Sequence, residues 1–116
     1  MAGFLFFPRA DKAQDDIWDY TVDNWGQAQA EKFIRGLHNH LQMLSDKLKP
    51  WCELPNSLIV PPNLDSAAYF SKYEHHYIFF RTLSKGRIGI MSILHEKSDI
   101  PVRLSADLES FSKQER

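Results

Sequence analysis

The stretch "HYIFFRTLSKGRIGIMSILH", residues 76–95, decides the fold class of this chain. Its two halves, 76–83 and 87–95, are rich in β-branched and aromatic residues, as is typical of strands. Gly86 lies in the short link between them, and glycine tolerates the positive φ that a tight hairpin turn requires. The stretch therefore predicts an antiparallel β-hairpin.

The second half of this hairpin is apolar at both alternating sets of positions. With a strict period of two, one face of the strand carries Ile88, Ile90 and Leu94, and the other carries Met91 and Ile93. A strand that is apolar on both faces is typical of the centre of a sheet covered on at least one side.

Two helical patterns precede the hairpin. Apolar residues of the segment 27–49 recur every three or four positions, which predicts an amphipathic helix that Pro50 ends. The segment 11–25 predicts a shorter helix, and Asp11 is suited to cap it because a carboxylate accepts hydrogen bonds from free helical N–H groups. Gly26 separates the two helices, so we expect an antiparallel helical hairpin.

The remaining segments complete an α+β pattern. Residues 4–7 predict a short buried strand that Pro8 ends, and residues 67–73 predict another strand. The chain after Pro101 predicts a short C-terminal helix. We therefore expect an N-terminal strand and a helical hairpin packed on a mostly antiparallel sheet of about four strands, in one domain that spans residues 1–116.

Composition narrows the possible functions. The net charge of −1 at pH 7 argues against a protein that binds nucleic acid broadly, since such proteins carry a basic excess. Cys52 is the only cysteine, which excludes an intrachain disulfide and fits a reducing compartment. No apolar run approaches the length of a membrane span, so we expect a cytoplasmic protein that does not bind membranes.

The histidines do not follow the spacing of a metal-ligand set. His75 and His76 are neighbours, and in an extended chain they point to opposite faces. His38 and His40 are two apart on a helix, about 200° around its axis. His95 has no partner at the spacing of a ligand pair. We expect neither a metal nor another cofactor.

Cationic side chains and a tyrosine lie along the two hairpin strands and just beyond them. Tyr77 and Arg81 share one strand face by the period of two, and His95 and Lys97 close the next strand, with Arg103 further along the chain. We expect Arg81, His95, Lys97 and Arg103 to gather at one rim of the sheet as a single contact patch. The same corner could cleave RNA without a metal, with Tyr77 or His95 moving protons and cations holding the phosphate.

A structural role is the alternative for two of these side chains. Tyr77 could be a core aromatic, and Arg81 could pair with an acid such as Glu96 or Asp99. The sequence leaves both interpretations open.

Two long pieces of the chain match a known family in their order and spacing. They are "ADKAQDDIWDYTVDNWGQAQAEKFIRGLHNHLQML" (10–44) and "HYIFFRTLSKGRIGIMSILHEKSD" (76–99). Together they resemble the ParE branch of the RelE/ParE toxin superfamily, which comprises the toxin halves of bacterial type II toxin–antitoxin pairs. The connection 50–66 departs from the family pattern, being longer and more apolar than usual.

The resemblance implies a toxin that a cognate antitoxin neutralises within a hetero-oligomer. We expect the apolar hairpin face to bind the antitoxin through Ile17, Tyr20, Phe33, Leu37 and Leu41, and an acidic antitoxin segment to cover the basic patch.

The resemblance also implies a target. ParE-like members are associated with inhibition of DNA gyrase, and this chain favours that function, with Arg81, His95, Lys97 and Arg103 as the contact residues. The alternative is a ribosome-associated mRNA endonuclease of the RelE type, in which Tyr77, Arg81, His95 and Lys97 would be catalytic. A third possibility is a relative that is inert or has another target.

Overall fold

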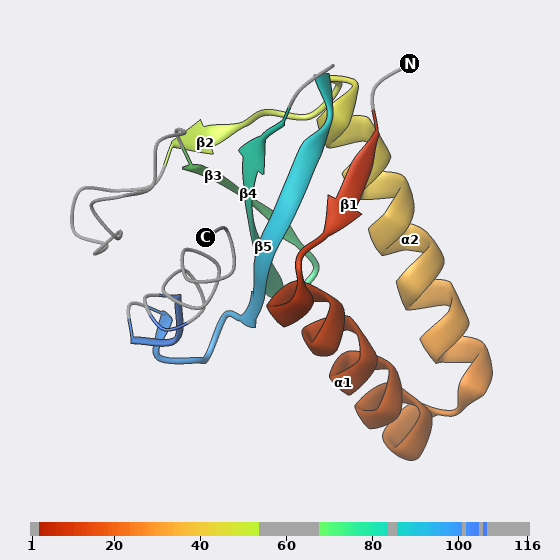
Figure 1. The fold of residues 1–116 in the computed structure, drawn as a ribbon. Helices are drawn as coiled ribbons and strands as arrows, with labels where there is room; N and C mark the ends of the chain where they lie inside the picture. Colours follow the sequence, from red (N-terminus) through yellow and green to blue (C-terminus); the bar gives the residue numbers. More distant parts are fainter. Residues whose placement is uncertain (1–2, 54–67, 84–85, 101, 105, 107–116) are drawn as a thin grey trace.

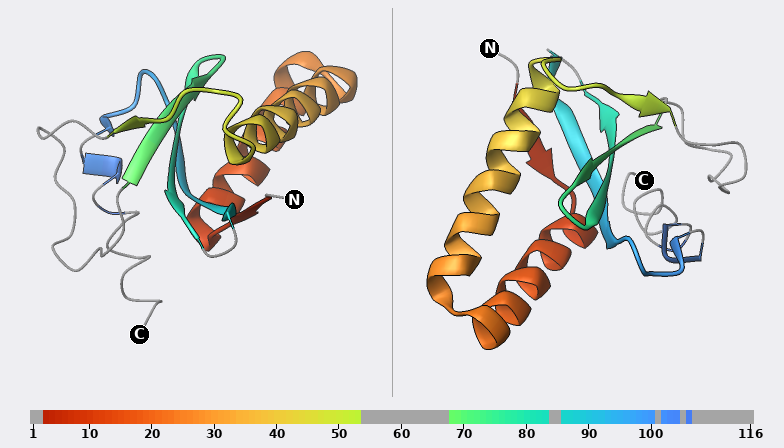
Figure 2. Two further views of the ribbon diagram at one scale, coloured as in Figure 1. Left: turned by 90° about the horizontal axis from the view of Figure 1, so that it is seen from above. Right: turned by 180° about the vertical axis from the view of Figure 1, so that it is seen from behind.

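The computed structural model describes residues 3–53, 68–83, 86–100, 102–104 and 106. Its elements are β1 (Phe4–Phe6), α1 (Pro8–Trp25), α2 (Gln27–Ser45), β2 (Cys52–Glu53), β3 (Ala68–Tyr73), β4 (His76–Thr82) and β5 (Ile88–His95). The two helices form a hairpin that covers one face of a single twisted sheet (Figures 1 and 2). The predicted α+β class is confirmed.

The sheet has five strands in the order β1-β5-β4-β3-β2. The pairs β2–β3, β3–β4 and β4–β5 are antiparallel, and β1 runs parallel to β5. The expected count of about four strands is one too low, because Cys52 and Glu53 pair with β3 as a short edge strand. These two residues lie near the start of the connection 50–66, and residues 54–66 of it lie outside the described part of the chain.

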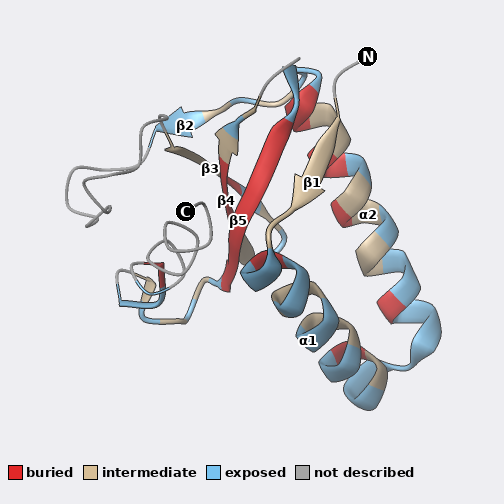
Figure 3. Cartoon of the chain, viewed as in Figure 1, coloured by how far each residue is buried: buried red, intermediate tan, exposed pale blue. Residues whose placement is uncertain are grey.

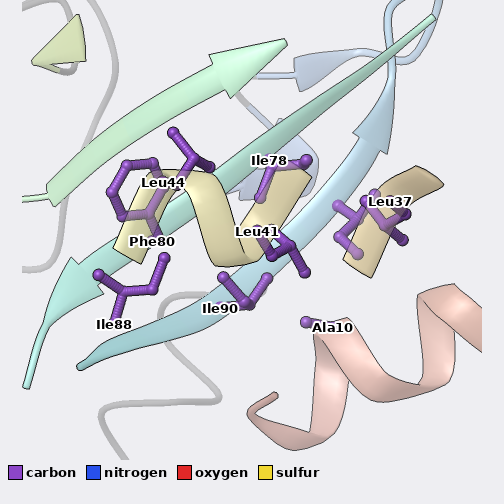
Figure 4. Close-up of a cluster of buried hydrophobic side chains, with 9 residues drawn as sticks. Ala10, Leu37, Leu41, Leu44, Ile78, Phe80, Ile88 and Ile90 are labelled. Carbon is purple, nitrogen blue, oxygen red and sulfur yellow. The ribbon is translucent and has the colours of Figure 1, made fainter. Parts of the chain in front are cut away.

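The main core lies between the hairpin and the sheet. Figure 4 shows Leu37, Leu41 and Leu44 of α2 facing side chains of β4 and β5. All three leucines are at most 1% exposed, and the strand side chains that meet them are Ile78, Phe80, Ile88, Ile90 and Ile93. Figure 3 shows the matching pattern, with buried residues along β5 and on the inner side of α2 and exposed residues on the outer side of α1.

A smaller cluster covers the opposite face of the sheet. It contains Phe79, Met91, Leu94 and Leu104. The expected C-terminal helix is helical at residues 102–104 and 106, which brings Leu104 onto this face.

A register shift between Phe79 and Phe80 changes the faces of β5. Phe79 pairs with Ser92 and Phe80 pairs with Ile90, so β5 contains an extra residue. Ile93 therefore returns to the helix side and Leu94 lies on the opposite side, which is the reverse of the strict alternation expected from the sequence. A bulge has no signature in the period of the sequence.

The helix ends also differ from the expectation. Helix α1 begins at Pro8, with Phe7 as a cap that makes no side-chain hydrogen bond, so the predicted cap at Asp11 is wrong. Proline is favoured at the first helical position because its φ suits the helix and its missing N–H is not needed there. Helix α2 ends at Ser45, before Pro50, because Lys47 adopts a left-handed φ of 62°.

Gly36 brings α2 close to the end of β3. A Cβ atom at this position would lie 2.1 Å from the Tyr73 Oη and 3.2 Å from its Cζ. The Tyr73 hydroxyl donates to the carbonyl of Phe33 at 3.3 Å, so this tyrosine crosses the helix backbone where a side chain is missing.

We predict that the effect of Gly36→Ala on the free energy of unfolding depends on the residue at position 73. Alanine is the better helix former by about 1 kcal/mol, but in the wild type it must displace Tyr73. We expect Gly36→Ala to lower the free energy of unfolding by about 1 kcal/mol in the wild type, and to be neutral or stabilising in Tyr73→Phe. Urea unfolding followed by circular dichroism measures both. Stabilisation in the wild-type background would contradict the close contact.

Candidate functional site

A groove runs between the helical hairpin and the turn that joins β3 to β4. Its larger part has a volume of about 790 Å³ and an adjoining part has about 410 Å³. We call it the hairpin groove. Its lining residues come from α1 (Asp16, Ile17, Tyr20, Thr21 and Trp25), α2 (Gln29, Lys32, Phe33 and Gly36) and the sheet (Tyr73, Glu74, His75, His76 and His95).

Aromatic side chains form much of this groove. Phe33 lines both parts of the groove, with ring centroids 5.3 Å from Tyr73 and 5.6 Å from His76, both in edge-to-face arrangements. Tyr20 is 65% exposed and Trp25 is 72% exposed. Large apolar side chains left open to water beside a concave surface are typical of protein contact sites.

A charged cluster lies beside this groove, at the open end of the β4–β5 pair. Glu96 accepts from Lys72 Nζ at 2.9 Å and pairs with His75 Nδ1 at 2.8 Å. The hydrogen bonds from Lys72 and His75 lower the pKa of Glu96 to about 2. The same bond from Lys72 to Glu96 raises the pKa of Lys72. This ion pair joins β3 to the end of β5.

His76 lies beneath this cluster and faces the groove. Burial, and then the nearby His95 and His75, lowers the pKa of His76 to about 4, so the imidazole is neutral near pH 7. Its ring meets that of His95 at right angles, 5.1 Å between centroids. Its Nδ1 is buried, and it has no hydrogen-bond partner in the part of the chain that the structure describes.

The predicted single patch of Arg81, His95 and Lys97 is wrong. The register pairs His76 with His95 and Arg81 with Gly89, so Arg81 lies at the turn end of the pair and His95 at the open end. Gly89 and His95 are six residues apart, which is about 20 Å along a strand. Lys97 stays beside His95, because its N–H donates to His95 Nδ1 at 3.1 Å.

Arg81 and His95 also face different sides of the sheet. Tyr77 and Phe79, which share a face of β4 with Arg81, pack in the cluster away from the helices, whereas His95 meets His76 on the helix side. Arg103 is exposed beside Leu104, which is buried in that far cluster. A basic corner that an acidic segment could cover is therefore not formed by these residues.

For Tyr77, the structural role considered as the alternative fits the structure better than a catalytic role. Tyr77 is half-buried and packs against the far-face cluster, as expected of a core aromatic. Glu96, one of the two acids considered for Arg81, pairs instead with Lys72 and His75.

The residues expected to bind an antitoxin divide into two groups. Ile17, Tyr20 and Phe33 line the hairpin groove, and their contact with a partner stays a prediction. Leu37 and Leu41 are 1% and 0% exposed, so the prediction that they contact a partner is wrong. Helical periodicity identifies the apolar face of α2 but does not tell which part of it the sheet covers.

Sequence reasoning overlooked Trp25 and Tyr73 as groove residues. Trp25 precedes Gly26 at the end of α1, and an apolar residue there would have been a usable signal. Tyr73 belongs to a stretch that the sequence does not distinguish from a solvated turn. Among the described residues, no group of three or more His, Cys, Asp or Glu side chains could hold a metal ion. None of the helices described has the length and apolar character needed to cross a membrane.

We predict that His76 makes stability depend on pH in a window from about 6.5 down to about 4. Its pKa is lower in the folded chain, so the unfolded chain binds the proton first and stability falls as the pH falls through this window. Replacing His76 with Phe keeps a ring against Phe33 and removes the titration. We expect the urea midpoint of His76→Phe to change less than that of the wild type between pH 7 and pH 4, and equal changes would contradict the assignment.

Comparison with known proteins places these features in a family. The family described as "ParE toxin of type II toxin-antitoxin system, parDE" matches residues 4–100. "Toxin ParE1" of Mycobacterium tuberculosis is 26% identical over 99 residues, which are 84% of this chain and 92% of that protein. "Toxin ParE" of Escherichia coli is 26% identical over 109 residues, 94% of this chain and 99% of that protein.

A solved structure shares the fold. It is titled "Chromosomal ParDE TA system from P. aeruginosa", with a TM-score of 0.56, 17% identity, and coverage of 82% of this chain and 96% of that one. The family match spans β1 to the end of β5 and agrees with the resemblance found in the sequence, which is thereby confirmed. The chain belongs to the ParE toxin family of type II toxin–antitoxin systems.

Proposed function

We propose that this protein is a toxin that a cognate antitoxin neutralises by occupying the hairpin groove. The exposed Tyr20 and Trp25 support this proposal, since an isolated chain leaves their apolar surface in water and a partner would bury it. The family match, and the similarity to the structure of a ParDE system from P. aeruginosa, support an antitoxin as that partner in a hetero-oligomer. Type II toxins of this kind act in the cytoplasm, and we propose the same location here.

We further propose that the toxin acts by binding DNA gyrase and not by cutting mRNA. The observation that carries this choice is the β4–β5 register, which separates Arg81 from His95 by about 20 Å. Metal-free RNA cleavage needs its base, its acid and its cations around one phosphate. A binding surface has no such requirement, because Arg81, Arg103 and the neighbouring pair His95 and Lys97 can contact separate parts of a large target.

Two parallel assays, one of gyrase supercoiling and one of mRNA cleavage, test the target. We expect expressed toxin to inhibit supercoiling by purified gyrase, while primer extension shows intact transcripts. The exchanges Arg81→Ala and His95→Ala should each weaken gyrase inhibition by about tenfold or less, the usual range for one contact. Codon-biased cuts in mRNA, together with a loss of several orders of magnitude in either variant, would instead support the endonuclease.

Substitutions of exposed apolar residues test whether the antitoxin binds in the groove. We expect Tyr20→Ser and Trp25→Ser each to weaken binding of the cognate antitoxin by about tenfold, because aromatic side chains at the centre of an interface carry much of its binding energy. Toxicity without antitoxin should not change. Leu48 is a matched control, since it is 69% exposed and apolar but does not line the groove. If Leu48→Ser weakens the complex as much as the groove variants, the antitoxin binds elsewhere.

A further inference from the structure

The adjoining part of the hairpin groove, with its volume of about 410 Å³, combines aromatic rings with carboxylates. We call it the aromatic pocket. It is lined by Asp16, Ile17, Tyr20, Thr21, Phe33, Glu74, His75, His76 and His95. In the described part of the chain, two of these lining residues are acids and none is a lysine or an arginine. Rings and carboxylates together are the lining that an organic cation requires.

Aromatic rings from α1, α2, β4 and β5 form the walls of this pocket. Phe33 contacts His76 edge to face, with 5.6 Å between ring centroids, and His76 contacts His95 in the same way at 5.1 Å. Tyr20 belongs to α1 and is 65% exposed, so its ring is open to a ligand. The faces of phenylalanine and tyrosine rings carry partial negative charge and attract cations.

The histidines of the pocket do not oppose a cation. Burial, more than the nearby His95 and His75, lowers the pKa of His76 to about 4, so this ring is neutral near pH 7. His95 accepts the backbone N–H of Lys97 at its Nδ1, at 3.1 Å, and an imidazole that accepts a hydrogen bond is neutral. His75 pairs with Glu96 at 2.8 Å, so a proton on His75 is balanced by that carboxylate.

The two carboxylates of the pocket come from different elements, Asp16 from α1 and Glu74 from the turn between β3 and β4. Glu74 has no ion pair or side-chain hydrogen bond among the residues that the structure describes. Asp16 pairs with Lys12 at 3.3 Å, but both side chains are largely exposed, and such pairs contribute little to stability. Both carboxylates are therefore available to a cation in the pocket.

The backbone of Glu74 is a separate observation that points to the same site. Tyr73 pairs with His76, so Glu74 and His75 alone form the turn, and Glu74 adopts a positive φ of 54°. This conformation is unfavourable for a residue with a Cβ atom, whereas glycine adopts it without that penalty. Residues held in such conformations concentrate at functional sites. A glutamate is thus a poor choice for the turn itself, and a role for its carboxylate in the pocket accounts for it.

We propose that the aromatic pocket binds an alkylguanidinium group. The planar cation packs on the rings of Tyr20 and Phe33, and its N–H groups donate to the carboxylates of Glu74 and Asp16. A guanidinium suits this lining better than an ammonium, because it stacks on aromatic faces, is more weakly hydrated and presents several donors in one plane. The site is a property of the isolated chain, so the inference goes beyond the proposed function and does not depend on it.

Two capped amino acids test the chemistry of the pocket. N-acetyl-arginine amide carries the guanidinium, and N-acetyl-citrulline amide has nearly the same shape without the charge. NMR titration of the full chain near pH 7 should show the arginine compound binding about tenfold tighter than the citrulline compound. The backbone amide signals of Glu74 and His76 should shift, and the preference should fade as salt rises from about 0.05 M to about 0.5 M.

Variants of the full chain locate this preference. Glu74→Gly removes a carboxylate and relieves the positive φ, so it should lower the preference to about threefold or less, while the urea midpoint stays the same or rises. A purely structural role for Glu74 does not predict a loss of binding without a loss of stability. Asp16→Asn should lower the preference similarly. Asp23→Asn is the matched control and should keep it, since Asp23 is an exposed aspartate of α1 that lines neither part of the groove.

Propylguanidine, which lacks the backbone amides of the capped arginine, distinguishes two sources of the group. If it binds as tightly as the arginine compound, the pocket recognises the guanidinium alone, as in a free small molecule. If it binds several-fold more weakly, the pocket also contacts the backbone of an arginine within a polypeptide. Either result supports the inference.

Three results would overturn it: failure of the arginine compound to bind, equal binding of the two capped compounds, or an unchanged preference in Glu74→Gly. The proposed function is tested separately, by antitoxin binding and by gyrase inhibition, so either proposal can fail while the other stands.

Discussion

The packing of α2 against the centre of the sheet is the contact on which the rest of the structure depends. Leu37, Leu41 and Leu44 fill the space above β4 and β5, and they leave almost no surface to water. The hairpin is held mainly by this face of α2 and by the start of α1, where Ala10 is fully buried. The end at which the two helices meet projects away from the sheet (Figures 1 and 2). The groove lies beside that projecting part, so the core that fixes the hairpin also creates the surface that a partner can use.

The antiparallel register of β4 and β5 is a second constraint, because it decides which polar side chains lie close together. A hairpin brings together residues at equal distances from its turn, so His76 meets His95 while Arg81 stays at the opposite end. The polar groups that do meet are Lys72, His75 and Glu96, which form a structural clamp between β3 and the end of β5. This clamp satisfies its own charges. The exposed aromatic residues of the groove, Tyr20 and Trp25, stay available for recognition.

The balance of charge in the chain conceals a local imbalance. The net charge of −1 argued against broad binding of nucleic acid, yet α1 alone holds five of the 15 acidic residues and two of the 14 cations. Local charge matters for binding because screening limits electrostatic attraction to about 8–10 Å at moderate salt. Of the five aspartates of α1, Asp16 lines the groove, so it is the one that a partner there would meet at close range.

The sequence by itself determined the elements and the family. Periodicity predicted both helices and the β4–β5 hairpin, because helices and strands impose different spacings on apolar residues. It could not predict the bulge beside Phe79 or the early end of α2, since a local backbone choice leaves no mark on that period. It also could not tell that Leu37 is covered while Tyr20 is open, or that Arg81 and His95 lie far apart. Those outcomes depend on the register between strands and on which part of a helix the sheet covers. Both are set by contacts between residues distant in the chain, and so only the tertiary structure decided them.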